Sequence, residues 1–170
     1  YQGVMEILNY LVVQKGHRKI AFINGPECYC NSIDQKRGYL DGVQKYCLEV
    51  DEEWMRNGDF LEGSGYREMA ELLQLSNRPT AVIVGSNPMA IGAMKAIKER
   101  GLEIPRDMSM VSITNLSISE YVDPALTVLD TVIAETGLKV VETLVRLLKG
   151  QELETEPIML QPTLVERASA

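Results

Sequence analysis

The strongest constraint on the fold is a regular alternation of buried-strand and amphipathic-helix patterns along the chain. Short apolar runs at 19–23, 81–84 and 108–113 are typical of strands that are buried on both faces. Between them apolar residues recur at helical spacing, and Gly16 and Gly101 stand where helices are expected to end. Strand and helix units recur with a period of roughly 25–30 residues, close to the length of a βαβ unit. The sequence therefore predicts an α/β fold, a parallel sheet with helices on both faces.

The periodicity predicts helices around 4–12, 40–47, 66–73 and 88–100. Asn87 is the expected N-cap of the last of these, with Pro88 as its first helical residue. Further strands are expected near 54–58 and within 157–167. A long helix at 133–149 follows the sheet and is not expected to pack on it. The polar stretch 150–157 is the expected flexible loop.

Length and charge limit the classes of function. The chain has 170 residues, enough for one domain or one domain with part of another. It carries 17 basic and 24 acidic residues, a net charge of −7, which disfavours direct contact with nucleic acid phosphates. No apolar run approaches the roughly 18 residues of a membrane span, and residues 1–16 do not resemble a signal peptide. No membrane partner is expected.

The cysteines predict neither a disulfide framework nor a metal site. There are three of them, Cys28, Cys30 and Cys47, and no set of four ligands at zinc-site spacing accompanies them. A reducing compartment, and so a cytoplasmic location, is the simplest interpretation.

Sequence features of catalysis and cofactor binding are absent. The turn Asn24-Gly25-Pro26 after the first strand is not a dinucleotide-binding G-x-G-x-x-G, and the chain has no Walker loop. The only histidine, His17, precedes the first strand, at the wrong end of the sheet for catalysis, and is expected to cap backbone carbonyls. We therefore expect no cofactor and a binding module rather than an enzyme; a small α/β enzyme is the weaker alternative.

Ligands of open parallel sheets bind beyond the carboxyl ends of the strands. Four loops form that edge here, at 25–32, 59–64, 85–88 and 114–120. Hydroxyls and amides can pair with a sugar or polyol while an aromatic ring covers its C–H surface. The same residue types are also ordinary turn and cap residues. The side chains singled out are Tyr29, Asn31, Ser32, Asp59, Phe60, Ser86, Asn87, Thr114, Asn115 and Ser117.

The chain resembles the effector-binding part of the lactose/galactose repressor (LacI/GalR) family of bacterial transcription regulators. The resemblance is strongest in Met-Ala-Ile-Gly-Ala-Met-Lys-Ala-Ile at 89–97. Further matching segments keep the family's order at 16–26, 37–39, 58–60, 64–66, 78–81, 101–105, 124–127 and 164–167.

The resemblance implies a periplasmic-binding-protein-like fold of two α/β lobes. Residues 1–170 would be the C-terminal lobe of the effector-binding domain, with a helix at about 131–150 returning to the N-terminal lobe. The N-terminal helix-turn-helix and most of the N-terminal lobe would be missing. A complete member would be a homodimer that binds operator DNA only through that missing segment. A small-molecule effector in the interlobe cleft would control DNA binding allosterically.

The resemblance also implies which residues of this sequence would bind an effector. Phe60 matches the family's stacking aromatic. Ile33 and Gln35 stand where the family often has arginines. Ser86-Asn87 replaces an Asn-Asp pair, and Thr114-Asn115 replaces an Asp-Asp pair. The positions that clamp sugar hydroxyls have thus become neutral, which fits a weaker sugar site, a less polar effector or a regulator tuned otherwise. With Tyr29 from the first loop, these residues are the candidate ligand site.

By resemblance, the helix at 89–100 and the segment around Tyr121 would face the dimer partner. The candidate interface residues are Met89, Ile91, Lys95 and Tyr121. The alternative function is an extracytoplasmic solute-binding receptor for a transporter, which shares the fold. A helix-turn-helix or a signal peptide at the start of the full-length protein would distinguish the two.

Overall fold

Six strands form one sheet in the computed structural model, which describes residues 1–151 and 158–170. They are β1 (Ile20–Asn24), β2 (Met55–Asn57), β3 (Ala81–Val84), β4 (Ser109–Ile113), β5 (Thr127–Asp130) and β6 (Thr163–Val165). Their order is β2-β1-β3-β4-β5-β6, parallel from β2 to β5 and antiparallel between β5 and β6. The predicted parallel sheet is confirmed, with one antiparallel strand at its edge.

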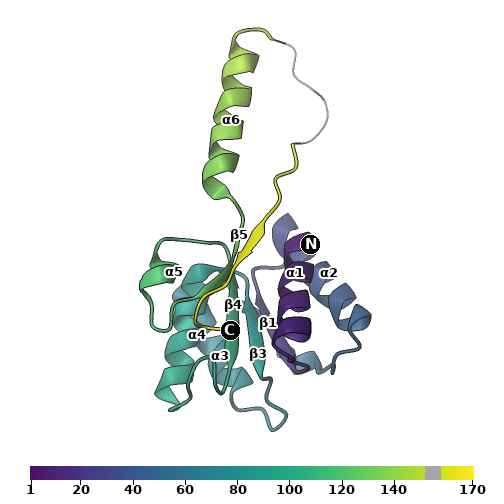
Figure 1. Cartoon of the computed structure of the whole chain (residues 1–170), viewed down its shortest axis with the longest axis vertical. Coiled ribbons are helices and arrows are strands. Elements are labelled where there is room, and N and C mark those ends of the chain that lie inside the picture. The colour runs from purple at the N-terminus through teal and green to yellow at the C-terminus, as the bar shows by residue number, and fades with distance from the viewer. Residues whose placement is uncertain (152–157) are drawn as a thin grey trace.

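Helices cover both faces of the sheet, as predicted. One face carries α1 (Gln2–Asn9), the π-helical turn Tyr10–Gln14 and α2 (Cys30–Lys45), and the other carries α3 (Glu62–Leu72) and α4 (Asn87–Glu99) (Figure 1). Successive strand residues point to opposite faces. Phe22 therefore belongs to the core beneath α1 and α2, and Ile23 to the core beneath α3 and α4. Burial on both faces explains why the central strands are continuous apolar runs.

Two glycines let α3 and α4 pack with their backbones in contact. A Cβ atom on Gly92 would lie 1.9 Å from the carbonyl oxygen of Glu62, and one on Gly65 would lie 2.0 Å from that of Met89. This approach buries Met89 completely.

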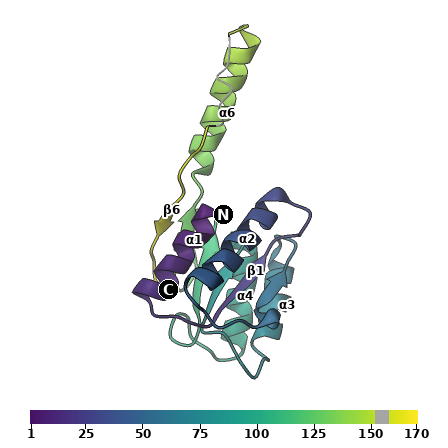
Figure 2. The same cartoon turned by 90° about the vertical axis from the view of Figure 1, so that its right-hand side faces the viewer.

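The long helix α6 (Ile133–Leu148) projects away from the sheet and its helical layers (Figures 1 and 2). None of its residues is buried, and Leu138 is 65% exposed. The expectation that this helix does not pack on the sheet is confirmed. Apolar residues along its length, such as Leu144 and Val145, are therefore exposed.

Three local predictions are corrected by the structure. The N-cap of α4 is Ser86, not Asn87, because Ser86 Oγ accepts from the Met89 N–H at 3.4 Å. The helix expected around 40–47 begins earlier, because α2 spans Cys30–Lys45 and Cys47 lies beyond its end. The strand β5 and the short helix α5 (Ile118–Tyr121) were not predicted. The expected loop at 150–157 lies mostly outside the described residues.

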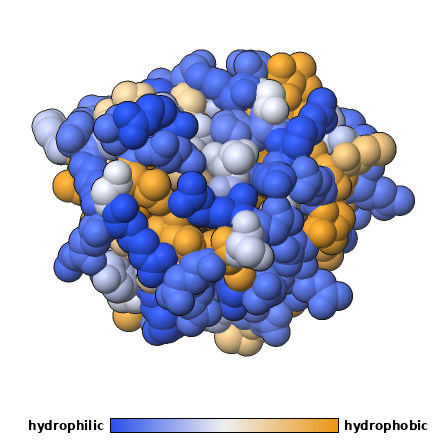
Figure 3. Space-filling model, turned by 90° about the horizontal axis from the view of Figure 1, so that it is seen from below, coloured by the Kyte–Doolittle hydropathy of each residue, from blue (hydrophilic) through white to orange (hydrophobic). Residues whose placement is uncertain are grey.

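The amino ends of the strands lie opposite to α6, on a face that is mostly hydrophilic (Figure 3). There His17 Nδ1 lies 2.9 Å from Thr80 Oγ1 and Nε2 lies 3.0 Å from Ser109 Oγ. The expectation that His17 caps carbonyls is therefore wrong, because its ring bonds to two hydroxyls. Burial, with a smaller contribution from the charge of Lys15, lowers the pKa of His17.

The lowered pKa of His17 predicts a pH-dependent contribution to stability. The unfolded chain binds the proton at about pH 6.5, whereas the folded chain resists it. We expect the His17 contribution to be complete above that pH and to decrease as pH falls through it. Urea unfolding at pH 7.5 and 5.5 should show a larger loss for the wild type than for His17→Gln. Carboxylate titration affects both proteins alike, so equal losses would contradict the assignment.

Candidate ligand-binding site

The predicted loops meet at the end of the sheet from which β5 continues into α6 (Figure 1). Five parallel strands place the carboxyl ends of β1 to β4 side by side at this edge. The loops after β1, β2, β3 and β4 carry Tyr29, Phe60, Ser86, Thr114 and Asn115. Asn87 is the first residue of α4, and Ile33 and Gln35 lie in the first turns of α2.

Tyr29 and Phe60 form an aromatic corner at this edge. Their ring centroids are 5.7 Å apart, with the rings at 69°, an edge-to-face contact. Tyr29 is 53% exposed and Phe60 is partly buried. Gly25 is required beneath them, because a Cβ atom there would lie 2.0 Å from Phe60 Cζ and 2.7 Å from Ser32 Oγ. The Phe60 ring and the Ser32 hydroxyl thus converge over the glycine.

Hydrogen bonds hold the short segment that carries Phe60. Phe60 has a left-handed backbone with φ 70°, which a non-glycine residue adopts only when its surroundings impose it. Ser64 Oγ accepts from the Asp59 N–H at 3.0 Å and donates to the Leu61 carbonyl at 2.9 Å. Hydrogen bonding from Ser64 also lowers the pKa of Asp59, so its carboxylate stays charged beside the ring.

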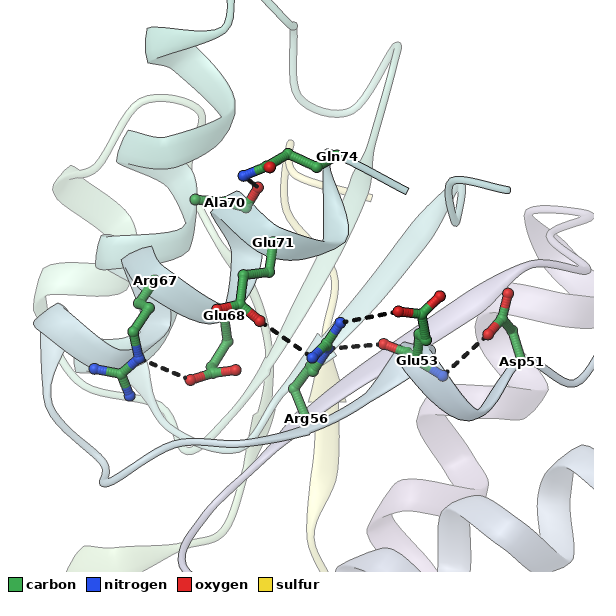
Figure 4. Close-up of polar contacts among 8 residues, drawn as sticks. All are labelled: Asp51, Glu53, Arg56, Arg67, Glu68, Ala70, Glu71 and Gln74. Carbon is green, nitrogen blue, oxygen red and sulfur yellow. Dashed lines mark hydrogen bonds and ion pairs between the residues drawn. The ribbon is translucent and has the colours of Figure 1, made fainter. Parts of the chain in front are cut away.

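Arg56 ties β2 to α3 on either side of this segment (Figure 4). Its Nε donates to the Glu53 carbonyl at 2.8 Å, and its Nη1 lies 3.1 Å from Glu71 Oε2 on α3. Because Phe60 lies between β2 and α3, this link fixes the path of the chain on which the ring stands.

A cavity of about 270 Å³ lies at the same edge, and we call it the acceptor pocket. Neither Tyr29 nor Phe60 lines it, but Ser32, whose Oγ lies over Gly25 with the Phe60 ring, does. It is lined by Asn24, Glu27, Ser32, Ile33 and Lys36. Lys36 Nζ lies 3.0 Å from Glu27 Oε1, and this pairing is the largest cause of the lowered pKa of Glu27. The pocket therefore carries one positive and one negative charge, paired with each other.

Of the two positions where arginines were expected by resemblance, Ile33 is 56% exposed and lines the acceptor pocket. Gln35 lines a separate small cavity at the ends of β4 and β5. Its Oε1 is buried and has no hydrogen-bond partner among the described residues.

The two candidate residues after β3 have different roles: Ser86 lies at the candidate ligand site, whereas Asn87 holds a neighbouring loop in place. Ser86 lies beside the aromatic corner, because its Oγ donates to the Phe60 carbonyl at 3.4 Å. Asn87 is buried, and its amide donates to Ser119 Oγ at 2.8 Å and accepts from the Leu116 N–H at 3.1 Å. The prediction of Asn87 as a ligand contact is therefore corrected: its side chain holds the loop after β4.

Asn115 lines a second cavity, of about 500 Å³, which shares no lining residue with the acceptor pocket, whereas Thr114 is not among the residues that line either cavity. Thr114 has φ 87° and is partly buried. Asn115 Nδ2 donates to Asp130 Oδ2 at 3.0 Å, and Asp130 Oδ1 accepts from the Val132 N–H at 2.8 Å. Asn115 thus connects the edge to the start of α6.

Sequence reasoning missed Asn24 and underrated Ser32. Asn24 ends the apolar run of β1, and a polar residue at the carboxyl end of a buried strand could have drawn attention to it. Ser32 was one of several hydroxyls in its loop. Its significance comes from complete burial without a partner, which only the packing of Phe60 and α2 reveals.

The four predicted dimer-interface residues differ in their exposure to solvent. Met89 is fully buried and cannot face a partner, so its assignment to an interface is wrong. Tyr121 is 81% exposed, Lys95 is exposed and Ile91 is partly exposed. Ile91 and Lys95 line a groove of about 300 Å³ with Met94, Lys98, Glu99, Val122 and Asp123.

The described residues contain no disulfide, no metal cluster and no membrane-spanning helix. All three cysteines are free and exposed. Residues 1–151 and 158–170 contain no cluster of three or more His, Cys, Asp or Glu side chains suited to a metal ion. None of the helices described there has both the length and the hydropathy needed to cross a bilayer.

A family model for the periplasmic binding protein-like domain matches residues 10–170. This chain belongs to that family. The match covers the whole sheet, helices α2 to α5 and the projecting helix α6, and it begins after α1.

Relatives confirm the LacI/GalR resemblance. The HTH-type transcriptional repressor PurR of Escherichia coli O1:K1 is 34% identical over 158 residues, 93% of this chain and 46% of that protein. A LacI-family regulatory protein of Chloroflexus aggregans has a TM-score of 0.90 at 36% identity, over 98% of this chain and 60% of that one. The CelR–cellobiose complex has a TM-score of 0.91 at 27% identity, over 99% and 51%. The chain spans about half the length of the curated relatives it matches.

The requirement for Gly25 gives a test of the aromatic corner. Gly25→Ala places a methyl group on Phe60, so we expect a loss of about 1–3 kcal/mol in the free energy of unfolding, as for other overpacked sites. Gly63→Ala is the matched control, because nothing lies within 4 Å of its added Cβ and the residue is helical. Urea unfolding should show the control at or above wild-type stability. If the two variants were equally stable, the Phe60 ring would not pack on Gly25.

Proposed function

We propose that this chain is the effector-binding and dimerisation part of a bacterial LacI/GalR-type transcription regulator. It binds a small polar ligand, sugar-like in chemistry, at the carboxyl edge of its sheet. Binding controls a DNA-binding helix-turn-helix that lies outside this chain. The observation that carries the proposal is the aromatic corner of Tyr29 and Phe60 beside the acceptor pocket. That arrangement offers an apolar ring face and polar groups to the same small molecule.

Relatives and charge support this assignment. PurR is by name an HTH-type repressor, and CelR is a regulator solved with cellobiose. The net charge of −7 is unsuited to binding operator phosphates directly, so DNA contact belongs to another segment. The kinship with repressors favours this function over an extracytoplasmic solute receptor, and a non-catalytic, cytoplasmic role follows from the same proposal.

The exposed face of α6 supports the domain organisation. We infer that residues 1–170 are the C-terminal lobe and that the helix at about 131–150 packs on the N-terminal lobe. Val140, Leu144 and Leu147 line an apolar groove of about 340 Å³ with Ile158 and Leu160. An amphipathic helix of this kind gains stability by covering its apolar face.

Effector control works by differential affinity in this proposal. A ligand held between two lobes favours the lobe arrangement in which it makes more contacts. The affinity of the DNA-binding segment for its operator depends on that arrangement. Effector binding therefore changes operator affinity, and operator binding changes effector affinity by the same factor.

Replacement of the stacking ring tests the proposed site. In the full-length protein, Phe60→Ala should weaken effector binding by about 1–3 kcal/mol, the scale of a buried aromatic contact. A thermal-shift screen against sugars, sugar phosphates, nucleobases and amino acids would identify a ligand, because ligands of the folded state raise the unfolding midpoint. Calorimetry then compares the variant with the wild type. Unchanged affinity would place the ligand elsewhere.

The proposed homodimer is tested at its most exposed aromatic residue. We propose that Ile91, Lys95 and Tyr121 face the partner. Tyr121→Asp should shift the full-length protein towards monomer in sedimentation velocity, because an unpaired charge would be buried at the interface. Val50→Asp is the control, since Val50 is 76% exposed next to the edge strand β2. If both variants dimerised as tightly as each other, Tyr121 would not lie in the interface.

A further inference from the structure

Two cysteines, Cys28 and Cys30, flank Tyr29 where the loop after β1 meets α2, and the proposed function does not use them. All three cysteines of the chain are free and exposed, whereas cysteine is among the most buried residue types in proteins. Reactivity rather than packing commonly decides the role of such residues. Cys47 lies apart, beyond the end of α2. Cys28 and Cys30, by contrast, bring two exposed thiols together within three positions of the chain.

The backbone between the two cysteines brings their Cα atoms within reach of a disulfide bond. Tyr29 is extended, with φ −92° and ψ 133°. One extended residue separates the Cα atoms on either side of it by about 6.6 Å, twice the rise of a strand. Cysteines joined by a disulfide have Cα atoms about 4.4–6.8 Å apart. The pair therefore lies near the upper limit, and closing the bond contracts the chain across Tyr29.

Tyr29 is held on both sides by contacts that such a contraction would disturb. Its N–H donates to the Pro26 carbonyl at 3.2 Å, and its carbonyl accepts from the Ile33 N–H at 3.1 Å in the first turn of α2. Its ring lies edge to face on Phe60, with the centroids 5.7 Å apart. A disulfide across Tyr29 is therefore strained and exposed, and disulfides of that kind are the easily reduced, regulatory ones.

We infer that Cys28 and Cys30 form a reversible modification site for hydroperoxides. The thiolate of one cysteine attacks the hydroperoxide and the O–O bond breaks. This cysteine becomes a sulfenic acid, and the leaving alkoxide takes the thiol proton to form an alcohol, or water when the oxidant is hydrogen peroxide. The second thiolate attacks the sulfenic sulfur. An S–S bond forms, the S–O bond breaks, and hydroxide takes the second thiol proton to leave as water. Two thiols are oxidised to one disulfide while one hydroperoxide is reduced.

Formation of this bond changes the aromatic corner. Because Tyr29 lies within the small ring that the bond closes, its side chain moves away from Phe60 and the first turn of α2 loosens. A cellular thiol such as glutathione reduces the bond by exchange and restores the contact. In a reducing compartment such disulfides are transient and serve as redox sensors. The site makes this edge of the sheet responsive to hydroperoxides as well as to an effector.

Peptide mapping of the full-length protein tests the bond. Trypsin releases Cys28 and Cys30 in one peptide, residues 20–36, and Cys47 in another, residues 46–56. The protein is treated with an equimolar amount of hydrogen peroxide and then with iodoacetamide. We expect the 20–36 peptide to lose two hydrogen atoms and to carry no alkyl group, while Cys47 is alkylated. Glutathione added before iodoacetamide should restore two alkylated cysteines in the 20–36 peptide.

Single serine variants are the matched controls. Cys28→Ser and Cys30→Ser each leave one thiol in the 20–36 peptide. We expect that thiol to stop at the sulfenic acid, which dimedone traps, with no loss of two hydrogen atoms. Cys47→Ser should behave as the wild type, because its thiol takes no part in the bond.

Hydrogen exchange followed by mass spectrometry tests the effect on the loop. Residues 25–33 should exchange faster in the oxidised wild type than in the reduced protein, because the bonds of Tyr29 to Pro26 and Ile33 are weakened. Peroxide should leave their exchange unchanged in Cys28→Ser. Equal exchange in the two redox states of the wild type would overturn the link to the aromatic corner.

Two mapping results would overturn the inference itself. One is a 20–36 peptide that still carries two alkyl groups after peroxide treatment. The other is oxidation of Cys47 at the same rate as that of the pair, because the pair would then have no special reactivity. Neither measurement uses an effector, so either result leaves the proposed function standing.

Discussion

Burial of the parallel sheet on both faces is the constraint from which the other features follow. The strands β1, β3 and β4 have no exposed residue, so neither face of the sheet can hold a ligand. Polar chemistry is confined to the strand ends, and parallel strands bring their carboxyl ends to one edge. The amino edge is closed by structural contacts such as those of His17 with Thr80 and Ser109. The loops after β1 and β2 then bring Tyr29 and Phe60 together across neighbouring strands.

The close packing of α3 on α4 shows where sequence patterns reach their limit. Residues 89–97 predict a helix and a family correctly, yet they do not reveal that Gly65 and Gly92 bring two backbones into contact. That contact covers Met89, which the family resemblance had placed at the dimer interface. Asn87 was misjudged for a related reason. Its local sequence suits an N-cap, but hydrogen bonds to Ser119 and Leu116, about 30 positions away, occupy its amide.

The candidate site could be predicted in outline and not in detail. The rule for parallel sheets located the edge, and the match to the family's stacking aromatic singled out Phe60. Whether a polar side chain at that edge is paired depends on atoms from several elements. Ser32 and Asn115 are similar in sequence terms, yet Asn115 bonds to Asp130 while the Ser32 hydroxyl has no partner in the described residues. Only the packed structure distinguishes a scaffold residue from a ligand contact.

Hydrogen bonds also join the carboxyl edge of the sheet to the start of helix α6. Asn115 donates to Asp130, Asp130 accepts from the Val132 N–H, and Val132 adopts a left-handed conformation with φ 49° at the start of α6. A β-branched residue in that region is held there by its surroundings. A ligand that contacts Asn115 therefore acts on the same hydrogen bonds that fix the direction of α6. Because coupling between sites requires contacts that differ between two arrangements, this short chain of bonds provides a place where such a difference can arise.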